Sequence, residues 1–212
     1  MKFSMAISGV LLFGFIVAHL IGNLQIFQGP DKINAYAAFL RVTPILLWMA
    51  RIGLFVLVTI HIVTAIRLTR SNHDARPVPY AVQHTVQANW GSLHMFDTGV
   101  LILLFTLFHL AHYSLGLLQP ELSRLTDGSG DPDVYSMVVL GFRNIWYVFF
   151  YILGMFAFAV HLGHGIYSFF QTLGLTHPVL MPLIKRSAAL IAWAIALGYI
   201  SIPVAVIAGV LS

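Results

Sequence analysis

The sequence contains no cysteine. This absence excludes disulfide bonds, thiolate catalysis and cysteine-ligated iron–sulfur clusters within the chain. A metal centre in this protein would therefore need ligands of another type.

Charged residues are also scarce. They make up 8% of the chain, against roughly 25% in soluble domains. Hydrophobic residues make up 59%, and the mean hydropathy is +0.88. So little charge cannot cover a water-exposed surface, which predicts an integral membrane protein. The net charge of +4 forms no basic stripe, which argues against nucleic acid as a partner.

Five apolar runs are long enough to cross a bilayer, which takes about 20 residues of helix. Proline and glycine mark several of their limits, as at Gly29, Pro44 and Pro120. The first run continues to about Phe27, so we expect it to span rather than to act as a cleaved leader. The runs do not alternate as membrane strands do. We expect an all-α integral membrane protein, a single membrane domain over 1–212, with transmembrane helices at about 5–27, 44–70, 93–118, 145–171 and 184–210.

Loop charge predicts the orientation. With the N-terminus inside, six lysines and arginines lie on the inner side and five on the outer side. We therefore expect a cytoplasmic N-terminus and a C-terminus on the outer side. The short segment 32–41 has helical composition and is expected to lie at the outer surface.

Among the histidines of the first four expected helices, we single out four, one from each helix: His19, His61, His109 and His161. An ionisable residue inside a span is costly and marks a functional candidate. Counted from the inner helix ends, His19 and His109 lie roughly 21–24 Å deep, and His61 and His161 roughly 14–15 Å. The four therefore form two layers about 8 Å apart, which pair the first helix with the third and the second with the fourth.

The two halves of the chain repeat each other around these histidines. Ser8 and Thr98 each open a motif of the form [S/T]-G-V-L, eleven residues before His19 and His109 (19 − 8 = 109 − 98 = 11). The other two histidines begin the matching segments "HIVTAI" and "HLGHGI". A duplicated two-helix unit would produce this pattern.

Paired neutral imidazoles on facing helices are suitable axial ligands for haem iron. We therefore expect the first four helices to form a haem-binding bundle that holds two b haems. The other nitrogen of each ligand then needs a carbonyl or hydroxyl partner. Small residues near the ligands would fit beside a flat macrocycle: Gly14, Gly22, Ala65, Gly163 and Gly165. Three different roles stay open for the four histidines: hydrogen bonds between helices, a proton relay and a zinc site.

Several further residues are weaker candidates. His112 and His164 each follow a candidate ligand by three residues, too close to serve a second layer. We interpret them as haem-edge, propionate or structural groups. Arg51, Arg67 and Arg143 at span ends could pair with haem propionates, or simply reach the interface. The remaining histidines fall in loops or at helix ends: His73, His84, His94 and His177.

In order along the chain, "SGVLLFGFIVAHLIGNLQIFQGPDKINAYA", "IHIVTAIRL", "TGVLILLFTLFHL" and "HLGHGIY" are similar to segments of a known family. The chain resembles the single-chain, five-helix, dihaem cytochrome b subunit of succinate:quinone oxidoreductases, which include quinol:fumarate reductases. The resemblance implies that His19 and His109 hold a distal haem near the outer face. It likewise implies that His61 and His161 hold a proximal haem near the inner face.

The resemblance also implies partners. A flavoprotein subunit with covalent FAD and an iron–sulfur subunit would dock on the cytoplasmic face of a prokaryotic inner membrane. Succinate would be oxidised in the flavoprotein, and this chain would carry electrons to a quinone, in this family often menaquinone. Quinone candidates on the outer side are Asn23, Gln25, Gln28 and Arg41. Candidates on the inner side are His84, Asn89, Trp90 and His94.

The chain departs from a fumarate reductase of this family at two positions. Ala159 stands where that enzyme has a glutamate for proton transfer, two residues before the fourth-helix ligand. Arg41 is the ungapped equivalent of a second glutamate, which helps quinol oxidation there. These departures favour succinate oxidation over fumarate reduction.

Three alternatives stay open: the membrane subunit of a quinol:fumarate reductase, the cytochrome b of another respiratory dehydrogenase, hydrogenase or bc complex, and a haem-free transporter that relays protons through histidines. A bc-type chain would place two ligands on one helix about four turns apart, and no helix here does so. A transporter predicts buried acids and broken helices, which this sequence hardly offers.

Overall fold

The computed structural model describes residues 1–75 and 90–212. These residues form helices and turns, and their one β-type pairing is an isolated bridge between Thr126 and Pro132. The elements in chain order are α1 (Lys2–Leu24), η1 (Gln25–Gln28), α2 (Pro30–Val42), α3 (Pro44–Asp74), α4 (Trp90–Leu93), α5 (Met95–His109), the π-helical turn η2 (Leu110–Ser114), η3 (Leu122–Arg124), α6 (Val134–Gly141), α7 (Ile145–Thr172) and α8 (Leu180–Ile207).

Five helical segments of the described chain are long and apolar enough to cross a membrane: Lys2–Gln28, Pro44–Asp74, Met95–Ser114, Ile145–Thr172 and Leu180–Ile207. They match the five expected runs, so the prediction of an all-α membrane protein with five transmembrane helices is confirmed. The third segment is shorter than the expected 93–118. It ends in η2, after which Gly116 adopts a positive φ of 60°. The helix expected at 32–41 is also present, as α2.

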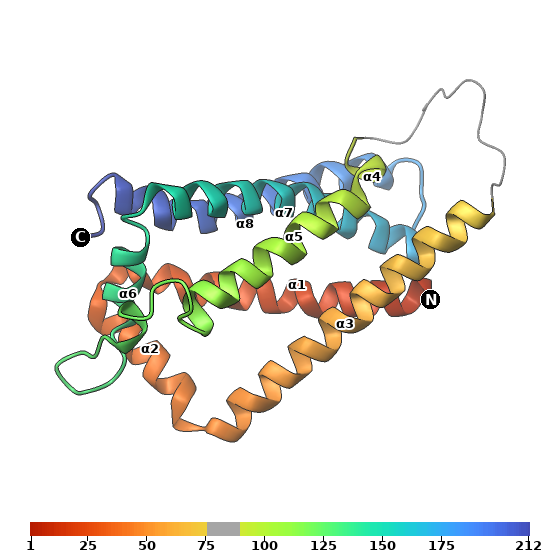
Figure 1. Cartoon of the computed structure of the whole chain (residues 1–212). Coiled ribbons are helices and arrows are strands. Elements are labelled where there is room, and N and C mark those ends of the chain that lie inside the picture. The colour runs from red at the N-terminus through yellow and green to blue at the C-terminus, as the bar shows by residue number, and fades with distance from the viewer. Residues whose placement is uncertain (76–89) are drawn as a thin grey trace.

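The long helices pack in neighbouring pairs (Figure 1). α1 packs against α3, α5 against α7, and α8 against both α7 and α1. The α7–α8 contact is close because small residues form it: Ala188, Ala192 and Ala196 are at most 1% exposed. The α1–α3 and α5–α7 pairs are the two units of the sequence repeat. In contrast, α1 does not pack closely against α5, nor α3 against α7.

α3 crosses the bundle obliquely. It lies beside α1 near the N-terminus and diverges from it toward Pro44 (Figure 1). We call the end of the bundle with Met1, Asp74 and α4 the amino end, and the end with α2, α6 and Ser212 the carboxyl end.

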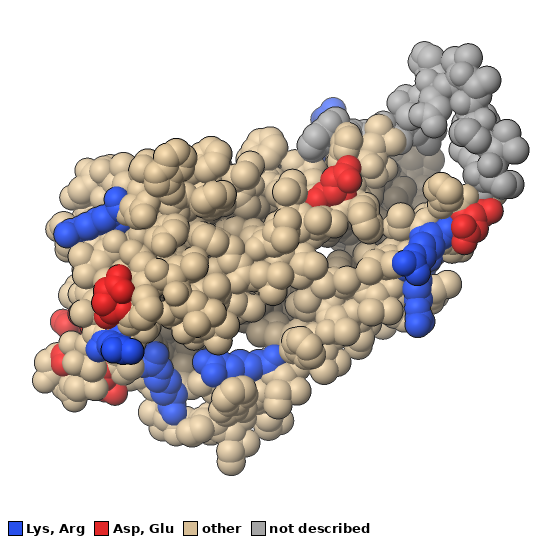
Figure 2. Space-filling view, in the orientation of Figure 1, with Lys and Arg blue, Asp and Glu red and all other residues tan. Residues whose placement is uncertain are grey.

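The outer surface of the bundle is that of a membrane protein. Figure 2 shows the charged side chains gathered mainly toward the two ends, with a largely uncharged surface between them. Large apolar side chains stand exposed there, such as Ile45 at 75% and Phe55 at 73%. Such a surface is stable only against lipid or another apolar partner.

Polar contacts tie α2 to α6 at the carboxyl end. The Asn34 amide donates to Asp133 Oδ1 at 3.1 Å, and the Tyr135 backbone N–H donates to Asn34 Oδ1 at 3.0 Å. Asp133 also caps α6 by accepting from the Ser136 backbone N–H at 3.0 Å. Burial raises the pKa of Asp133, but the hydrogen bonds from Ser136 and Asn34 outweigh it, so the net pKa lies below its ordinary value.

Candidate functional site

The structure brings His61 of α3 and His161 of α7 together near the amino end. Their ring centroids lie 6.4 Å apart, with the planes at 62°. Each ring also meets a hydroxyl through its Nδ1 atom. Ser8 Oγ of α1 lies 3.2 Å from His61 Nδ1, and Thr98 Oγ1 of α5 lies 3.2 Å from His161 Nδ1. Each histidine of this pair is thus held by the neighbouring helix of its own repeat unit.

The glycine that follows each hydroxyl residue provides room for the imidazole. A Cβ atom on Gly9 would lie 3.5 Å from His61 Cε1, and one on Gly99 would lie 3.5 Å from His161 Cε1. These are ordinary van der Waals distances, so each glycine lies directly beside an imidazole. In the sequence, the repeated [S/T]-G pair belongs to the motif of His19 and His109. In the structure, it serves the histidines of the other layer, on the adjacent helices.

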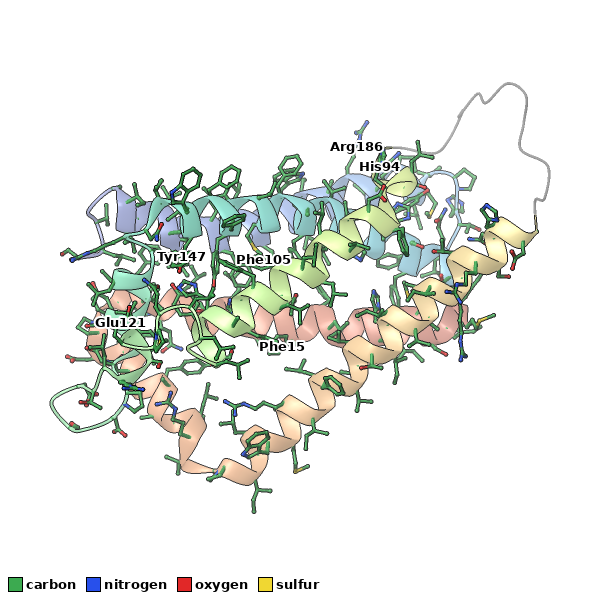
Figure 3. The ribbon with its side chains drawn as sticks, in the orientation of Figure 1. Phe15, His94, Phe105, Glu121, Tyr147 and Arg186 are labelled. Carbon is green, nitrogen blue, oxygen red and sulfur yellow. The ribbon has the colours of Figure 1, made fainter. Side chains whose placement is uncertain are left out.

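His19 of α1 and His109 of α5 meet nearer the carboxyl end. Their ring centroids lie 6.0 Å apart, with the planes at 77°. The His19 ring stacks on Phe15, one turn earlier, at 5.3 Å and 14°. The His109 ring lies over Phe105 at 6.1 Å and 25°. Phe15 and Phe105 are therefore repeat-related supports of this pair (Figure 3).

A hydrogen-bonded chain extends from His109 toward the carboxyl end. Tyr151 Oη of α7 lies 3.1 Å from His109 Nδ1 and 3.2 Å from His112 Nδ1. The far nitrogen of His112, Nε2, lies 2.8 Å from Gln119 Oε1. The π-helical turn η2 places His112, so that both histidines reach one hydroxyl; such turns are frequent at functional sites. Sequence reasoning missed Tyr151 and Gln119, because neither belongs to the repeat.

His112 has a structural place, since it is 3% exposed and both of its ring nitrogens are hydrogen-bonded. Its ring also stacks on Tyr113 at 4.0 Å. His164 lies apart from this chain, partly buried, with its ring 6.5 Å from Tyr167.

The two layers are further apart than the expected 8 Å. Ser8 is level with His61 because the two side chains touch, and eleven residues separate Ser8 from His19 along α1, which is about 16 Å. The same count holds on α5 from Thr98 to His109. The spacing predicted from the sequence is too small because it counts residues from helix ends taken to lie at the same depth, whereas α3 runs obliquely (Figure 1).

The geometry of both pairs fits a metal shared between two imidazoles. Two rings bound to one metal through nitrogens at about 2 Å have their centroids roughly 6 Å apart, close to the observed 6.4 and 6.0 Å. Within the described ranges, no three histidine or acidic side chains gather in a metal-binding group. Two protein ligands per site suit a cofactor that brings its own equatorial ligands, as haem does.

The helices that carry each pair do not pack closely against each other. A Cβ on Gly14 or Gly165 would meet nothing within 4 Å. The other glycines expected near a macrocycle are used in protein packing instead. A Cβ on Gly22 would overlap the Tyr36 ring, and Gly163 faces α8.

The arginine candidates lie exposed at the span ends. Arg51 Cζ lies 5.1 Å from the Trp48 ring centroid, a cation–π contact. Arg67 and Arg143 are exposed. Their pairing with propionates stays a prediction.

The quinone candidates are placed unequally. His84 and Asn89 lie outside the described residues, and Trp90 begins α4 without a described side chain. Gln28 is exposed at the end of η1. Arg41 helps to line a pocket of about 250 Å³ at the carboxyl end, together with Tyr113, Ser123, Asp133 and Met137 among others. The Tyr113 hydroxyl is buried beside it with no hydrogen-bond partner in the described chain.

No model of a known protein family, no curated protein and no solved structure matches this chain. Its function therefore has to be inferred from the residues and their geometry.

Proposed function

We propose that this chain is the dihaem cytochrome b membrane anchor of a succinate:quinone oxidoreductase, with one b haem between His61 and His161 and another between His19 and His109. The observation that carries the proposal is the pairing of four intramembrane histidines in two layers. Ring spacings near 6 Å, and helices that stay apart where the rings meet, support axial ligation of two planar groups. The sequence motifs supply the choice of family.

In this role the protein's own residues hold and orient the cofactors. The haems would supply one-electron transfer across the membrane. The imidazoles would provide both axial ligands at each site, and the aromatic side chains Phe15 and Phe105 would restrict rotation of the outer pair. The arginines at the span ends are available for haem propionates.

The proposal includes an assembly. A flavoprotein with covalent FAD and an iron–sulfur subunit dock at the amino end, which faces the cytoplasm of a prokaryotic cell. The haems held by the two histidine pairs would supply electron transfer from the iron–sulfur subunit to a quinone, in this family often menaquinone. Succinate oxidation is the favoured direction, because the position two residues before His161 is Ala159, 2% exposed, and not a glutamate.

Purification of the complex from its native membrane tests this proposal. We expect two low-spin b haems per chain and co-purifying subunits with covalent flavin and iron–sulfur clusters. A hydrogenase or molybdenum subunit in their place would contradict the assignment to succinate oxidation. An intact, assembled chain without haem would contradict the cytochrome function altogether, and pH-dependent transport by that colourless protein in liposomes would favour a proton relay.

A further inference from the structure

Three of the four candidate haem ligands share a structural feature. The Nδ1 atoms of His61, His161 and His109 each lie 3.1–3.2 Å from a hydroxyl oxygen on another transmembrane helix. Those hydroxyls belong to Ser8, Thr98 and Tyr151. A neutral imidazole carries its proton on one nitrogen alone, and only the other nitrogen can bind a metal. The direction of each hydrogen bond therefore decides which nitrogen is free.

The hydroxyls of Ser8 and Thr98 each donate their proton to a carbonyl of their own helix. Thr98 Oγ1 donates to the His94 carbonyl at 2.8 Å, one turn back on its own helix. Ser8 Oγ donates to the Met5 carbonyl at 3.1 Å in the same way. Each oxygen can then only accept from the histidine. With the hydroxyl protons on those carbonyls, His61 and His161 carry their own protons on Nδ1, which leaves Nε2 unprotonated.

The Tyr151 hydroxyl gives His109 the same Nδ1–H form through a longer chain of hydrogen bonds. Gln119 Oε1 is an acceptor, so His112 donates from Nε2 and accepts at Nδ1. Tyr151 donates to that Nδ1 atom, and its oxygen accepts from Nδ1 of His109. His109 therefore also carries its proton on Nδ1. The amide orientation of Gln119 sets the direction of the whole chain.

We propose that Ser8, Thr98 and Tyr151 are positioning residues that hold these three histidines in the Nδ1–H tautomer and so present Nε2 to the metal. The proposal rests on the haem-binding function proposed above. It explains why the [S/T]-G pair is repeated, since each hydroxyl residue and the glycine after it contact the ring of a histidine ligand on the adjacent helix. His19 differs, because in the described structure only ring contacts, such as the stacking on Phe15, reach its imidazole.

A second consequence concerns the reduction potential. An imidazole that donates from Nδ1 to a fixed acceptor is a more basic ligand, and a more basic ligand favours oxidised iron. Removal of the acceptor should therefore raise the potential of the haem that the histidine serves, and of that haem only.

The test is a potentiometric titration of both haems in the purified complex, with electron paramagnetic resonance as a second readout. We expect Ser8→Ala and Thr98→Ala to raise the potential of the inner haem, whereas Ser8→Thr and Thr98→Ser keep it at the wild-type value. Tyr151→Phe and Gln119→Leu should shift the outer haem alone. Thr59→Ala and Thr106→Ala are matched controls, since these hydroxyls bond only to carbonyls of their own helices, and both potentials should stay unchanged.

The outcomes separate the two proposals. If Ser8→Ala loses the inner haem while Ser8→Thr retains it, the hydroxyl is required and the inference stands. Bound haems whose potentials and resonance signals are the same in the alanine and phenylalanine variants as in the wild type would overturn the inference but leave the cytochrome function intact. A wild-type complex without haem would overturn both.

Discussion

The hydroxyl of Tyr199 on α8 donates to the backbone carbonyl of Ile16 on α1, at an O···O distance of 2.7 Å. The same tyrosine ring lies 6.1 Å from the ring of His19. α8 carries no histidine, yet this contact fixes the turn of α1 that presents His19. The fifth helix therefore supports His19 of the His19–His109 pair through Tyr199.

Replacement of Tyr199 by phenylalanine removes that hydrogen bond and keeps the ring. We expect a loss of about 1 kcal/mol in the free energy of unfolding, and weaker retention of the outer haem. Thermal denaturation in detergent, followed by the haem spectrum, measures both effects. Tyr167→Phe is the matched control, because Tyr167 accepts a single exposed hydrogen bond from Gln171. Equal stability of the two variants would contradict a supporting role for Tyr199.

Gly154 on α7 permits close approach of α5. A Cβ there would overlap the Phe105 ring, and Phe105 lies beside both His109 and Tyr151. Gly154→Ala should therefore destabilise the protein by about 1–3 kcal/mol and release the outer haem before the inner one. Gly53→Ala on α3, where a Cβ meets nothing within 4 Å, should be neutral or slightly stabilising. Haem content during a heating series distinguishes the two variants, and equal haem loss in both would contradict this packing role.

The hydrogen bonds of Asp133 with Asn34 and Ser136 predict that the stability of the protein depends on pH. Because the folded state lowers the pKa of this carboxyl, the ionised carboxylate stabilises the folded state fully above the ordinary pKa of about 3.9. It is lost as the pH falls through the lower, folded-state value. Unfolding midpoints measured as a function of pH should decline in the wild type below about pH 4 and decline less in Asp133→Asn. If the unfolding midpoints of the wild type and of Asp133→Asn had the same pH dependence, the Asp133 carboxylate would not stabilise this end of the bundle.

The pocket beside Arg41, at the carboxyl end of the bundle, is a candidate site for the proposed quinone chemistry. Arg41→Leu should raise the KM for a water-soluble quinone about tenfold, a loss of about 1.4 kcal/mol, with both haems retained. Arg124→Leu is a suitable comparison, because Arg124 lies at the same end of the bundle but does not line the pocket. An unchanged KM in Arg41→Leu would move the search to the inner side, where His84 and Trp90 remain candidates.

The apolar runs were sufficient to predict five membrane helices, since a bilayer leaves few other solutions for such segments. The pairing of the histidines could also be predicted, because the repeat places His19 opposite His109 and His61 opposite His161. The contacts around the ligands could not be predicted from the sequence. Ser8 and Thr98 act across helices, and a sequence period alone does not show which neighbouring helix a side chain meets. Tyr151 and Gln119 belong to no repeat, and the π-helical turn that brings His112 to Tyr151 has no clear sequence signal.

The most direct measurement is the low-temperature absorption spectrum and haem content of four single variants: His19→Ala, His61→Ala, His109→Ala and His161→Ala. The two pairs predict two outcomes only. His19→Ala and His109→Ala should lose the same spectral component, and His61→Ala and His161→Ala should lose the other. Retention of both haems in any of these variants, or loss of different components within a pair, would contradict the account.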